Sequence, residues 1–263
     1  MKRVSWLMVV ILGICLTVMP MNTDAASYGW GYKKGTNHEP PEVGKYANIL
    51  EKYGGYYLDK SGDKVIYLTF DNGYEQGYTG DILNVLNEYQ IPATFFVTGH
   101  YVESSEELVK RMVKDGHIVG NHTYYHPDLT TISKEEMKKE LDKLEKAVAN
   151  ITSQKSMKYV RPPKGAFSDQ SLQWLNEFGY IPMFWSLAFV DWNINDQKGW
   201  QKSYNSVIQQ IHPGAVILLH TVSKDNADAL EHLITDLRKQ GYTFKSLDDL
   251  VLKDILPPSI FGM

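Results

Sequence analysis

Acids and histidines stand directly after runs of β-forming residues at several points of this sequence. Asp71 follows the run 65–70, and His220 follows the run 216–219. Such runs predict buried strands, and in parallel α/β folds the loops at the carboxyl ends of the strands carry the chemistry. An ionised acid there could act as a general base, and a histidine as its partner acid. The plain alternatives are a turn at residues 71–73 and a structural histidine at position 220.

Two further histidines have a spacing that could bind a metal. His122 and His126 are four residues apart. If this segment forms a helical turn, both imidazoles lie on one face and can chelate one ion. Surface histidines at this spacing are also common, so the pair alone is a weak indication.

Two other segments could supply hydrogen-bond donors and an orienting acid. Arg161 and the N–H of Lys164 flank Pro162 and Pro163, whose rings stiffen the backbone and cannot donate. A simple exit from a strand is the alternative for this segment. Asp191 could orient a histidine, or it could be a surface acid beside a core aromatic residue.

The elements that must position these residues follow a strand and helix alternation after Asp63. Helix patterns end at Gly116, Gly179 and Gly241, where glycine is the expected C-terminal cap, and a short apolar run follows each. Strands are predicted near residues 64–70, 93–98, 117–120, 158–161, 181–186, 215–219 and 242–245. Seven strands separated by helices imply a parallel sheet, either closed as an incomplete barrel or open and doubly wound. If the sheet closes, the polar residues after the strands converge on one face.

Capping patterns predict where two helices begin. Ser104 with Glu107, and Ser133 with Glu136, have the spacing of a capping box. Behind the second, apolar residues recur at intervals of three and four over residues 137–151, which predicts one buried face.

The first 26 residues have the pattern of a secretory signal peptide. A positive start precedes an apolar run over residues 4–19, and Ala25 and Ala26 are the expected cleavage positions. An uncleaved membrane anchor is the main alternative. The single cysteine, Cys15, lies in this run, so the mature chain has no disulfide and depends on its core for stability.

The remaining chain is expected to hold one domain with an extension. Residues 27–63 are rich in glycine and aromatic residues; they are expected to wrap the barrel or close its seam, with a platform for sugar rings as the alternative. Residues 64–263 form the expected domain. The 263-residue chain has a formal charge of -4 and no basic block, which argues against nucleic acid as a partner.

Five motifs in order resemble those of a known family. They are Thr69-Phe-Asp-Asn-Gly73, His122-Thr-x-x-His126, Arg161-Pro-Pro-x-Gly165, Asp191-Trp192 and Leu218-x-His220. Over roughly residues 64–250 they are similar to the NodB-like polysaccharide deacetylases, carbohydrate esterase family 4. The resemblance implies a distorted, incomplete (β/α) barrel of about seven parallel strands, and hydrolysis of the acetamide of an N-acetylated glycan.

The resemblance also implies a role for each motif residue. Asp71 would be the general base, paired with Arg161, and His220 would be the general acid, oriented by Asp191. His122, His126 and the residue at position 72 would bind a divalent metal such as zinc, manganese or cobalt. Pro163, Leu218 and Trp192 would shape the substrate site, and the N–H of Lys164 would complete the oxyanion site.

This sequence departs from the family pattern at three positions. Asn72 stands where the family usually has a second Asp, so the metal site is expected to be weakened. Ala188 stands where the fourth motif usually begins with an acid. Lys164 replaces a residue that is usually aromatic, and its ammonium could meet a substrate carboxylate such as the lactyl group of muramic acid.

Within the family, the likeness is strongest to enzymes that deacetylate N-acetylmuramic acid in peptidoglycan during formation of the spore cortex muramic δ-lactam. That implies peptidoglycan glycan strands as partner, and secretion to the cell envelope or the spore intermembrane space without a stable membrane anchor. An inactive peptidoglycan-binding module and a deacetylase of N-acetylglucosamine polymers are the alternatives. The oligomeric state stays open.

Overall fold

The computed structural model describes residues 26–256. The expected signal peptide lies almost entirely outside these described residues, as do the last seven residues of the expected domain. Within residues 26–256, no helix is both long enough and apolar enough to cross a membrane.

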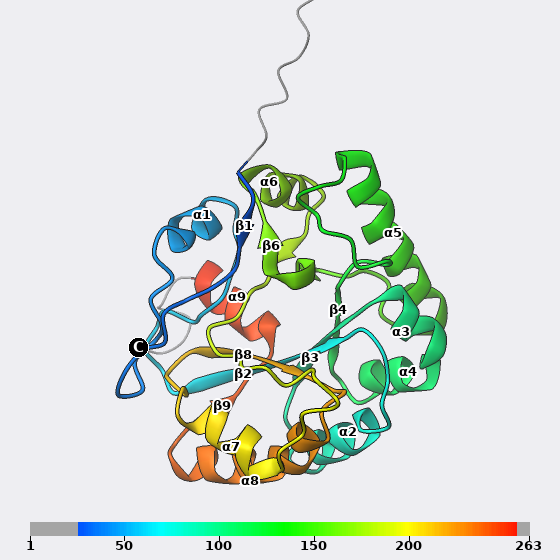
Figure 1. Cartoon of the computed structure of the whole chain (residues 1–263). Coiled ribbons are helices and arrows are strands. Elements are labelled where there is room, and N and C mark those ends of the chain that lie inside the picture. Colours follow the sequence, from blue (N-terminus) through cyan, green and yellow to red (C-terminus); the bar gives the residue numbers. More distant parts are fainter. Residues whose placement is uncertain (1–25, 257–263) are drawn as a thin grey trace, which may run out of the picture.

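Seven parallel strands form the central sheet, as the alternation predicted. They are β2 (Val65–Asn72), β3 (Ala93–Val97), β4 (Ile118–Asn121), β5 (Tyr159–Val160), β7 (Ile181–Pro182), β8 (Ala215–His220) and β9 (Thr243–Phe244). The strand order is β7-β5-β4-β3-β2-β8, and β9 pairs with the start of β2. The sheet curls into an incomplete barrel, so the prediction of an incomplete (β/α) barrel is confirmed (Figure 1).

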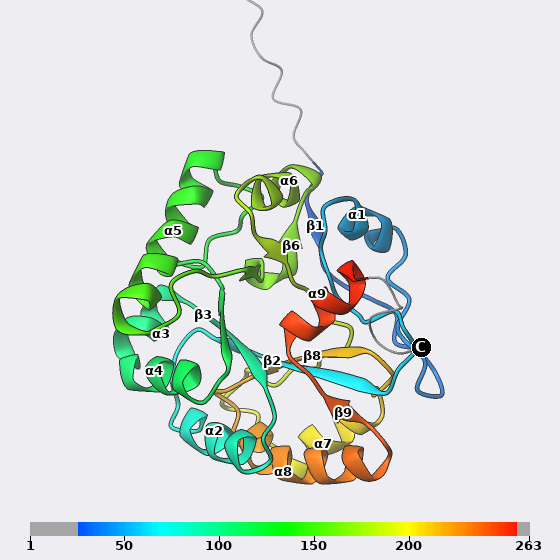
Figure 2. The same cartoon turned by 180° about the vertical axis from the view of Figure 1, so that it is seen from behind.

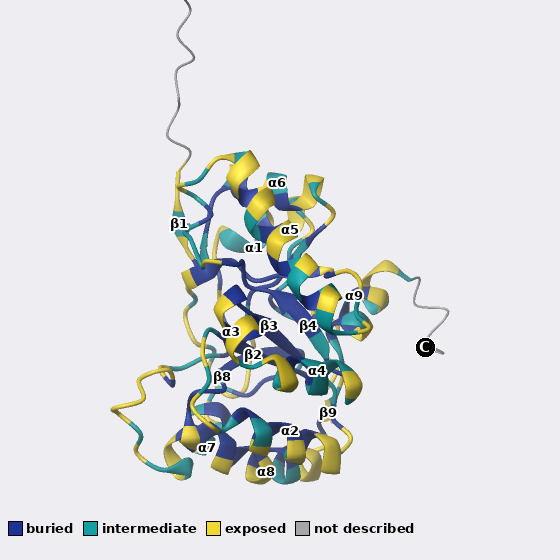
Figure 3. Ribbon diagram, turned by 90° about the vertical axis from the view of Figure 1, so that its right-hand side faces the viewer, coloured by how far each residue is buried: buried dark blue, intermediate teal, exposed yellow. Residues whose placement is uncertain are grey.

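Helices surround the sheet as an outer layer (Figure 1). They are α1 (Tyr46–Lys52), α2 (Thr79–Glu88), α3 (Gly99–Ser104), α4 (Glu106–Lys114), α5 (Lys134–Ile151), α6 (Asp169–Glu177), α7 (Trp200–Ile208), α8 (Lys224–Lys239) and α9 (Leu247–Ile255). Each buries an apolar stripe and turns its polar side outward, so the ring of helices is exposed outside and the strands are buried within it (Figure 3). The glycines at 116, 179 and 241 have φ near +85° and end α4, α6 and α8 as predicted.

One of the two predicted capping boxes is wrong. Ser133 caps α5 and exchanges hydrogen bonds with Glu136, as predicted. Ser104, however, is the last residue of α3, and its hydroxyl donates to the His100 carbonyl at 2.8 Å. Helix α4 begins after Ser105 instead, because α3 already occupies the positions that the spacing assigned to a loop.

The segment before β2 bridges the gap between the outer strands of the sheet. Tyr56 forms a parallel bridge with Met183, just beyond β7, and Leu58 forms an antiparallel bridge with Ala215 at the start of β8. Upstream, β1 (Tyr28–Gly29) pairs with β6 (Ala166–Phe167). These two-residue strands were not predicted, since they are too short to carry a pattern.

Aromatic residues of this extension pack inward. Trp30 is only 9% exposed. Its ring lies 4.8 Å from the ring of Phe184 and 5.3 Å from that of Tyr57, measured between centroids. These rings are therefore part of the core, and Trp30 is not available as a sugar platform.

Helix α9 covers the barrel interior near the amino ends of the strands, as Figure 2 shows. Its residues Leu247, Leu250 and Val251 pack with inward-facing side chains of the strands, among them Tyr67 and Val216. Helix α9 does not cover the carboxyl ends of the strands, where polar residues such as Asp71 and His220 lie.

Candidate active site

The pairing of β2 with β8 places the two principal titratable residues side by side. Asp71 and His220 are partners in the parallel register, each at the carboxyl end of its strand. Side chains alternate along a strand, so Thr69 and Asp71 face the same side of the sheet. A slip of one residue in this register would separate the carboxylate from the imidazole.

Arg161 forms a buried ion pair with the carboxylate of Asp71. The arginine follows β5, is completely buried, and donates from Nη1 to Asp71 Oδ1 at 2.8 Å. Its Nη2 donates to Thr69 Oγ1 at 2.8 Å and its Nε to the Met183 carbonyl at 3.2 Å. Its guanidinium also lies 4.1 Å from the ring centroid of Phe96. These contacts fix the arginine in one orientation, as expected of a buried planar fork.

The balance of burial and charge keeps Asp71 ionised. Burial alone would raise the pKa of this carboxyl, but the positive charge of Arg161, with contributions from His122 and His220, lowers the pKa below its ordinary value. Asp71 is therefore a carboxylate at neutral pH, and Oδ2 is not engaged by the arginine.

Asp191 orients the histidine beside this carboxylate. Its Oδ1 accepts from His220 Nδ1 at 2.7 Å, and its Oδ2 accepts from the His220 backbone N–H at 2.8 Å. Asn226 on α8 donates to the same Oδ2 at 2.6 Å. Burial lowers the pKa of His220, but the charge and hydrogen bond of Asp191, together with the charge of Asp71, outweigh burial, and the net pKa is raised. The geometry leaves Nε2 as the atom that can give or take a proton.

The two other histidines meet, although not through a helical turn. Residues 122–126 form a loop in which Thr123 and His126 have φ of 64° and 58°, so the helical turn considered as a condition for shared chelation is not formed. The loop nevertheless brings the two Nε2 atoms of His122 and His126 to 3.2 Å. The Arg161 carbonyl can only accept, so His122 Nδ1 donates to it at 2.8 Å, and the unprotonated His122 Nε2 faces His126 Nε2. Burial lowers the pKa of both His122 and His126, that of His126 to about 4. Both imidazoles are therefore neutral at neutral pH.

The donor atoms present fit a weak divalent metal site. Zinc–nitrogen bonds are about 2.1 Å long, so two nitrogens 3.2 Å apart can contact one ion. Within the described part of the chain, no group of three or more His, Cys, Asp or Glu side chains could hold a metal. Asn72 offers a different donor: its Nδ2 donates to Thr221 Oγ1 at 2.7 Å, while its buried Oδ1 has no hydrogen-bond partner among residues 26–256. An orphaned oxygen of this kind can be satisfied by a cation.

The remaining predicted site residues surround this centre to different degrees. Lys164 is exposed, has φ of 59°, and lies close enough to His126 for its charge to act on that ring. Pro163 and Leu218 are buried. Trp192 is half exposed, and its ring centroid lies 5.4 Å from that of His220.

A cavity of about 560 Å³ opens above these residues. It is lined by Asp71, Gly73, Tyr74, Thr98, His100, Glu103, His122, Tyr124, Tyr125, His126, Trp192, His220 and Val222. The base, the acid and both metal-type histidines therefore share one cavity, whereas Asn72, Arg161 and Asp191 lie behind its wall.

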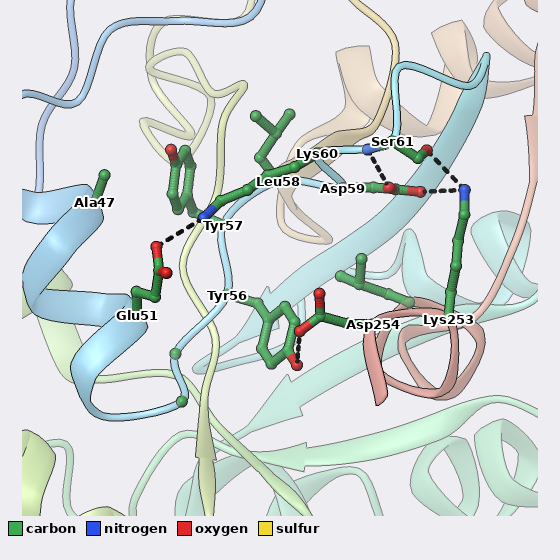
Figure 4. Close-up of a pocket in the computed structure, with 13 residues that line it drawn as sticks. Ala47, Glu51, Tyr56, Tyr57, Leu58, Asp59, Lys60, Ser61, Lys253 and Asp254 are labelled. Carbon is green, nitrogen blue, oxygen red and sulfur yellow. Dashed lines mark hydrogen bonds and ion pairs between the residues drawn. The ribbon is translucent and has the colours of Figure 1, made fainter. Parts of the chain in front are cut away.

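A second cavity, of about 350 Å³, lies between α1, α9 and the segment before β2 (Figure 4). Its charged side chains face one another across the opening. Lys60 pairs with Glu51 at 3.1 Å, Lys253 pairs with Asp59 at 3.1 Å, and Tyr56 donates to Asp254 at 2.8 Å. None of the predicted site residues lines this cavity.

Two supporting residues were not predicted as part of the site. Thr69 orients Arg161, and its position two residues before Asp71 in a strand was a usable signal. Asn226 fixes Asp191 from α8. Nothing in the sequence indicates that role, because it arises only when α8 packs beside β8.

A carboxylate, an oriented histidine and two neutral imidazoles together can hydrolyse an amide. The chain is similar to known proteins over most of its length. The polysaccharide deacetylase profile matches residues 59–183. The peptidoglycan-N-acetylmuramic acid deacetylase PdaA of Bacillus subtilis is 52% identical over 233 residues, covering 88% of this chain and 89% of that protein. A peptidoglycan-N-acetylglucosamine deacetylase of Bacillus cereus is 32% identical over 207 residues, covering 76% of this chain and 73% of that protein.

Solved structures agree with this assignment. The structure of Bacillus subtilis PdaA, a family 4 carbohydrate esterase, matches with a TM-score of 0.85 over 87% of this chain and 98% of that one, at 52% identity. A family 4 pseudoenzyme from Bacillus anthracis matches with a TM-score of 0.69 over 75% of this chain and 68% of that one, at 28% identity. With this sequence identity, this fold and this constellation of side chains, the chain belongs to the polysaccharide deacetylase family, the hydrolases of carbohydrate esterase family 4.

Proposed function

We propose that this enzyme removes the acetyl group from N-acetylmuramic acid residues of peptidoglycan. The observation that carries the proposal is the pairing of Asp71 with His220 across two strands, each held by its own buried partner. Base, arginine, acid and orienting acid are all in place, which favours an active enzyme over a peptidoglycan-binding module.

In the proposed reaction, Asp71 takes a proton from a water molecule, and the water oxygen attacks the acetamide carbon. Negative charge then develops on the acetamide oxygen. We assign the backbone N–H of Lys164 as the hydrogen-bond donor to this oxygen. His220 gives a proton to the nitrogen, the carbon–nitrogen bond breaks, and acetate and a free amine leave. A divalent ion held by His122, His126 and Asn72, when bound, would supply positive charge that polarises the acetamide oxygen.

The choice of muramic acid is supported by Lys164 and by the name of the Bacillus subtilis relative. Lys164 is exposed beside His126 and has no ion-pair partner among residues 26–256. N-acetylmuramic acid differs from N-acetylglucosamine by a lactyl group with a carboxylate, which a free ammonium at the rim would attract. The product would be the amine from which the muramic δ-lactam of the spore cortex forms. A peptidoglycan substrate requires secretion to the cell envelope or the spore intermembrane space.

Mass spectrometry can test the sugar specificity. Purified peptidoglycan is treated with the enzyme and digested with a muramidase, and the fragments are sequenced. Loss of one acetyl group from muramic residues alone supports the proposal. Loss from glucosamine residues would instead make the enzyme a deacetylase of N-acetylglucosamine polymers.

A further inference from the structure

An exposed aromatic ring stands at the rim of the catalytic cavity without a role in the chemistry. Tyr125 lies in the loop between the two metal-type histidines and is 69% exposed, although it lines the cavity. Tyrosine is enriched at interfaces, because its ring is apolar and its hydroxyl can hydrogen-bond.

One contact holds the Tyr125 backbone, and three hold its ring. The Tyr125 N–H donates to Glu140 Oε2 on α5 at 2.7 Å, and its hydroxyl bonds to the Lys143 ammonium of the same helix. Its ring centroid lies 4.8 Å from that of Tyr124, with the planes at 72°. The Lys143 Nζ lies 4.2 Å from the ring centroid.

The neighbouring ring is itself seated on the scaffold. Tyr124 packs against Gly99 so closely that a Cβ there would lie 2.6 Å from the ring. Its hydroxyl bonds to Glu103 on α3, and its carbonyl accepts from the Gly99 N–H at 3.0 Å. Tyr124 is therefore a fixed support, and Tyr125 is the exposed surface presented on it.

We propose that Tyr125 is a stacking platform for the sugar next to the one that is deacetylated. This inference rests on the proposed function, since it assumes that a glycan strand occupies the cavity. When one sugar lies over Asp71 and His220, the strand must leave across the rim, and Tyr125 is adjacent to His126 there. The C–H face of a sugar ring is apolar and covers an exposed aromatic ring, and a platform that is already ordered loses little entropy on binding.

Chain-length dependence tests the platform. Values of kcat and KM are measured on N-acetylmuramic acid itself, which has no neighbouring sugar, and on an octasaccharide cut from peptidoglycan and freed of peptides, for the wild type, Tyr125→Ala and Tyr125→Phe. We expect Tyr125→Ala to lower the octasaccharide-to-monosaccharide ratio of kcat/KM by about three- to tenfold, through KM. Tyr125→Phe keeps the ring and should keep the ratio.

Controls separate failure of the platform from failure of the proposed function. Leu252→Ala removes another exposed side chain, on α9, and should leave the ratio unchanged. An unchanged ratio in Tyr125→Ala, or an equal fall in Tyr125→Phe, would overturn the platform. If the wild type releases no acetate from either substrate, the proposed function fails. The platform is then tested separately by calorimetry, which compares the affinity of Asp71→Asn for the octasaccharide with and without Tyr125→Ala; equal affinities would overturn the platform.

Discussion

The two cavities of this molecule contain similar residues but arrange them differently. Both are lined by tyrosines, carboxylates and cationic or titratable side chains. In the cavity near the amino ends of the strands, each of three carboxylates is paired with a neighbouring side chain. Glu51 pairs with Lys60, Asp59 with Lys253, and Asp254 accepts from Tyr56 (Figure 4). At the carboxyl ends, buried groups converge on one point and some stay unsatisfied, as Asn72 Oδ1 does.

This difference separates structural charges from functional ones. Removing one partner of a buried charge pair leaves an uncompensated charge and destabilises the fold, so the buried Asp59, paired with Lys253, is a structural charge. Backbone strain lies close to this cavity as well: among residues 26–256, three of the six non-glycine residues with positive φ are Thr123, His126 and Lys164, and His126 lines the cavity. Strain and unsatisfied groups in one place are typical of an active site.

Exchanging one aspartate for asparagine in each cavity should affect different properties, activity in one cavity and stability in the other. Asp71→Asn removes the base and should lower kcat by about a thousandfold. Asp59→Asn weakens the contacts of Asp59 with Tyr67 and Lys253, and should lower the free energy of unfolding by about 2 kcal/mol with kcat unchanged. Acetate release and chemical denaturation measure the two effects. Loss of activity in Asp59→Asn with its fold intact would contradict the comparison.

The pH profile tests the orientation of the acid. Asp191 raises the pKa of His220 against the effect of burial, so kcat should fall as pH rises through this raised value. The protonated pair also stabilises the fold below a pH of about 6.5, and this contribution is lost as pH rises through the raised pKa. Asp191→Asn should move the alkaline limb of kcat to lower pH, with a loss of about a hundredfold near neutrality. Superimposable limbs would show that Asp191 does not set this pKa.

Restoring the family carboxylate should strengthen the metal site. Asn72→Asp supplies a charged oxygen, and the Thr221 hydroxyl, which accepts from Asn72 Nδ2, can donate to the new carboxylate instead, so zinc affinity should rise by about tenfold or more. Isothermal titration with zinc measures this rise independently of activity. Asn87→Asp adds the same charge at an exposed position on α2 and is the matched control. Equal zinc affinity in wild type and Asn72→Asp would mean that position 72 does not contact the metal.

The smallest effect is expected at the rim. Lys164→Ala should raise KM for muramic-containing glycan by a few-fold, because an exposed ion pair contributes only about 0.2–1 kcal/mol. Lys60→Ala, in the paired cavity, is the matched control and should not change KM. An unchanged KM of Lys164→Ala for muramic-containing glycan would refute its role in specificity.

Much of this arrangement could be predicted, because strands and their ends have local signals. The seven strands followed from apolar runs and capping glycines, and their parallel order placed Asp71 and His220 together. The His122 loop was harder, since its left-handed residues, Thr123 and His126, have no distinct sequence pattern. The closing bridges of Tyr56 and Leu58, and the support of Asp191 by Asn226, depend on contacts between distant segments that periodicity does not report.

Acetate release from purified peptidoglycan by the wild-type enzyme tests the account most directly. The assay is run after exhaustive chelation and again with zinc, manganese, cobalt or magnesium added back. The account predicts acetate release that Asp71→Asn abolishes, and a rise on adding metal would show that His122, His126 and Asn72 form a working site. No acetate under any condition, with the glycan still bound, would contradict it and make this barrel a peptidoglycan-binding module.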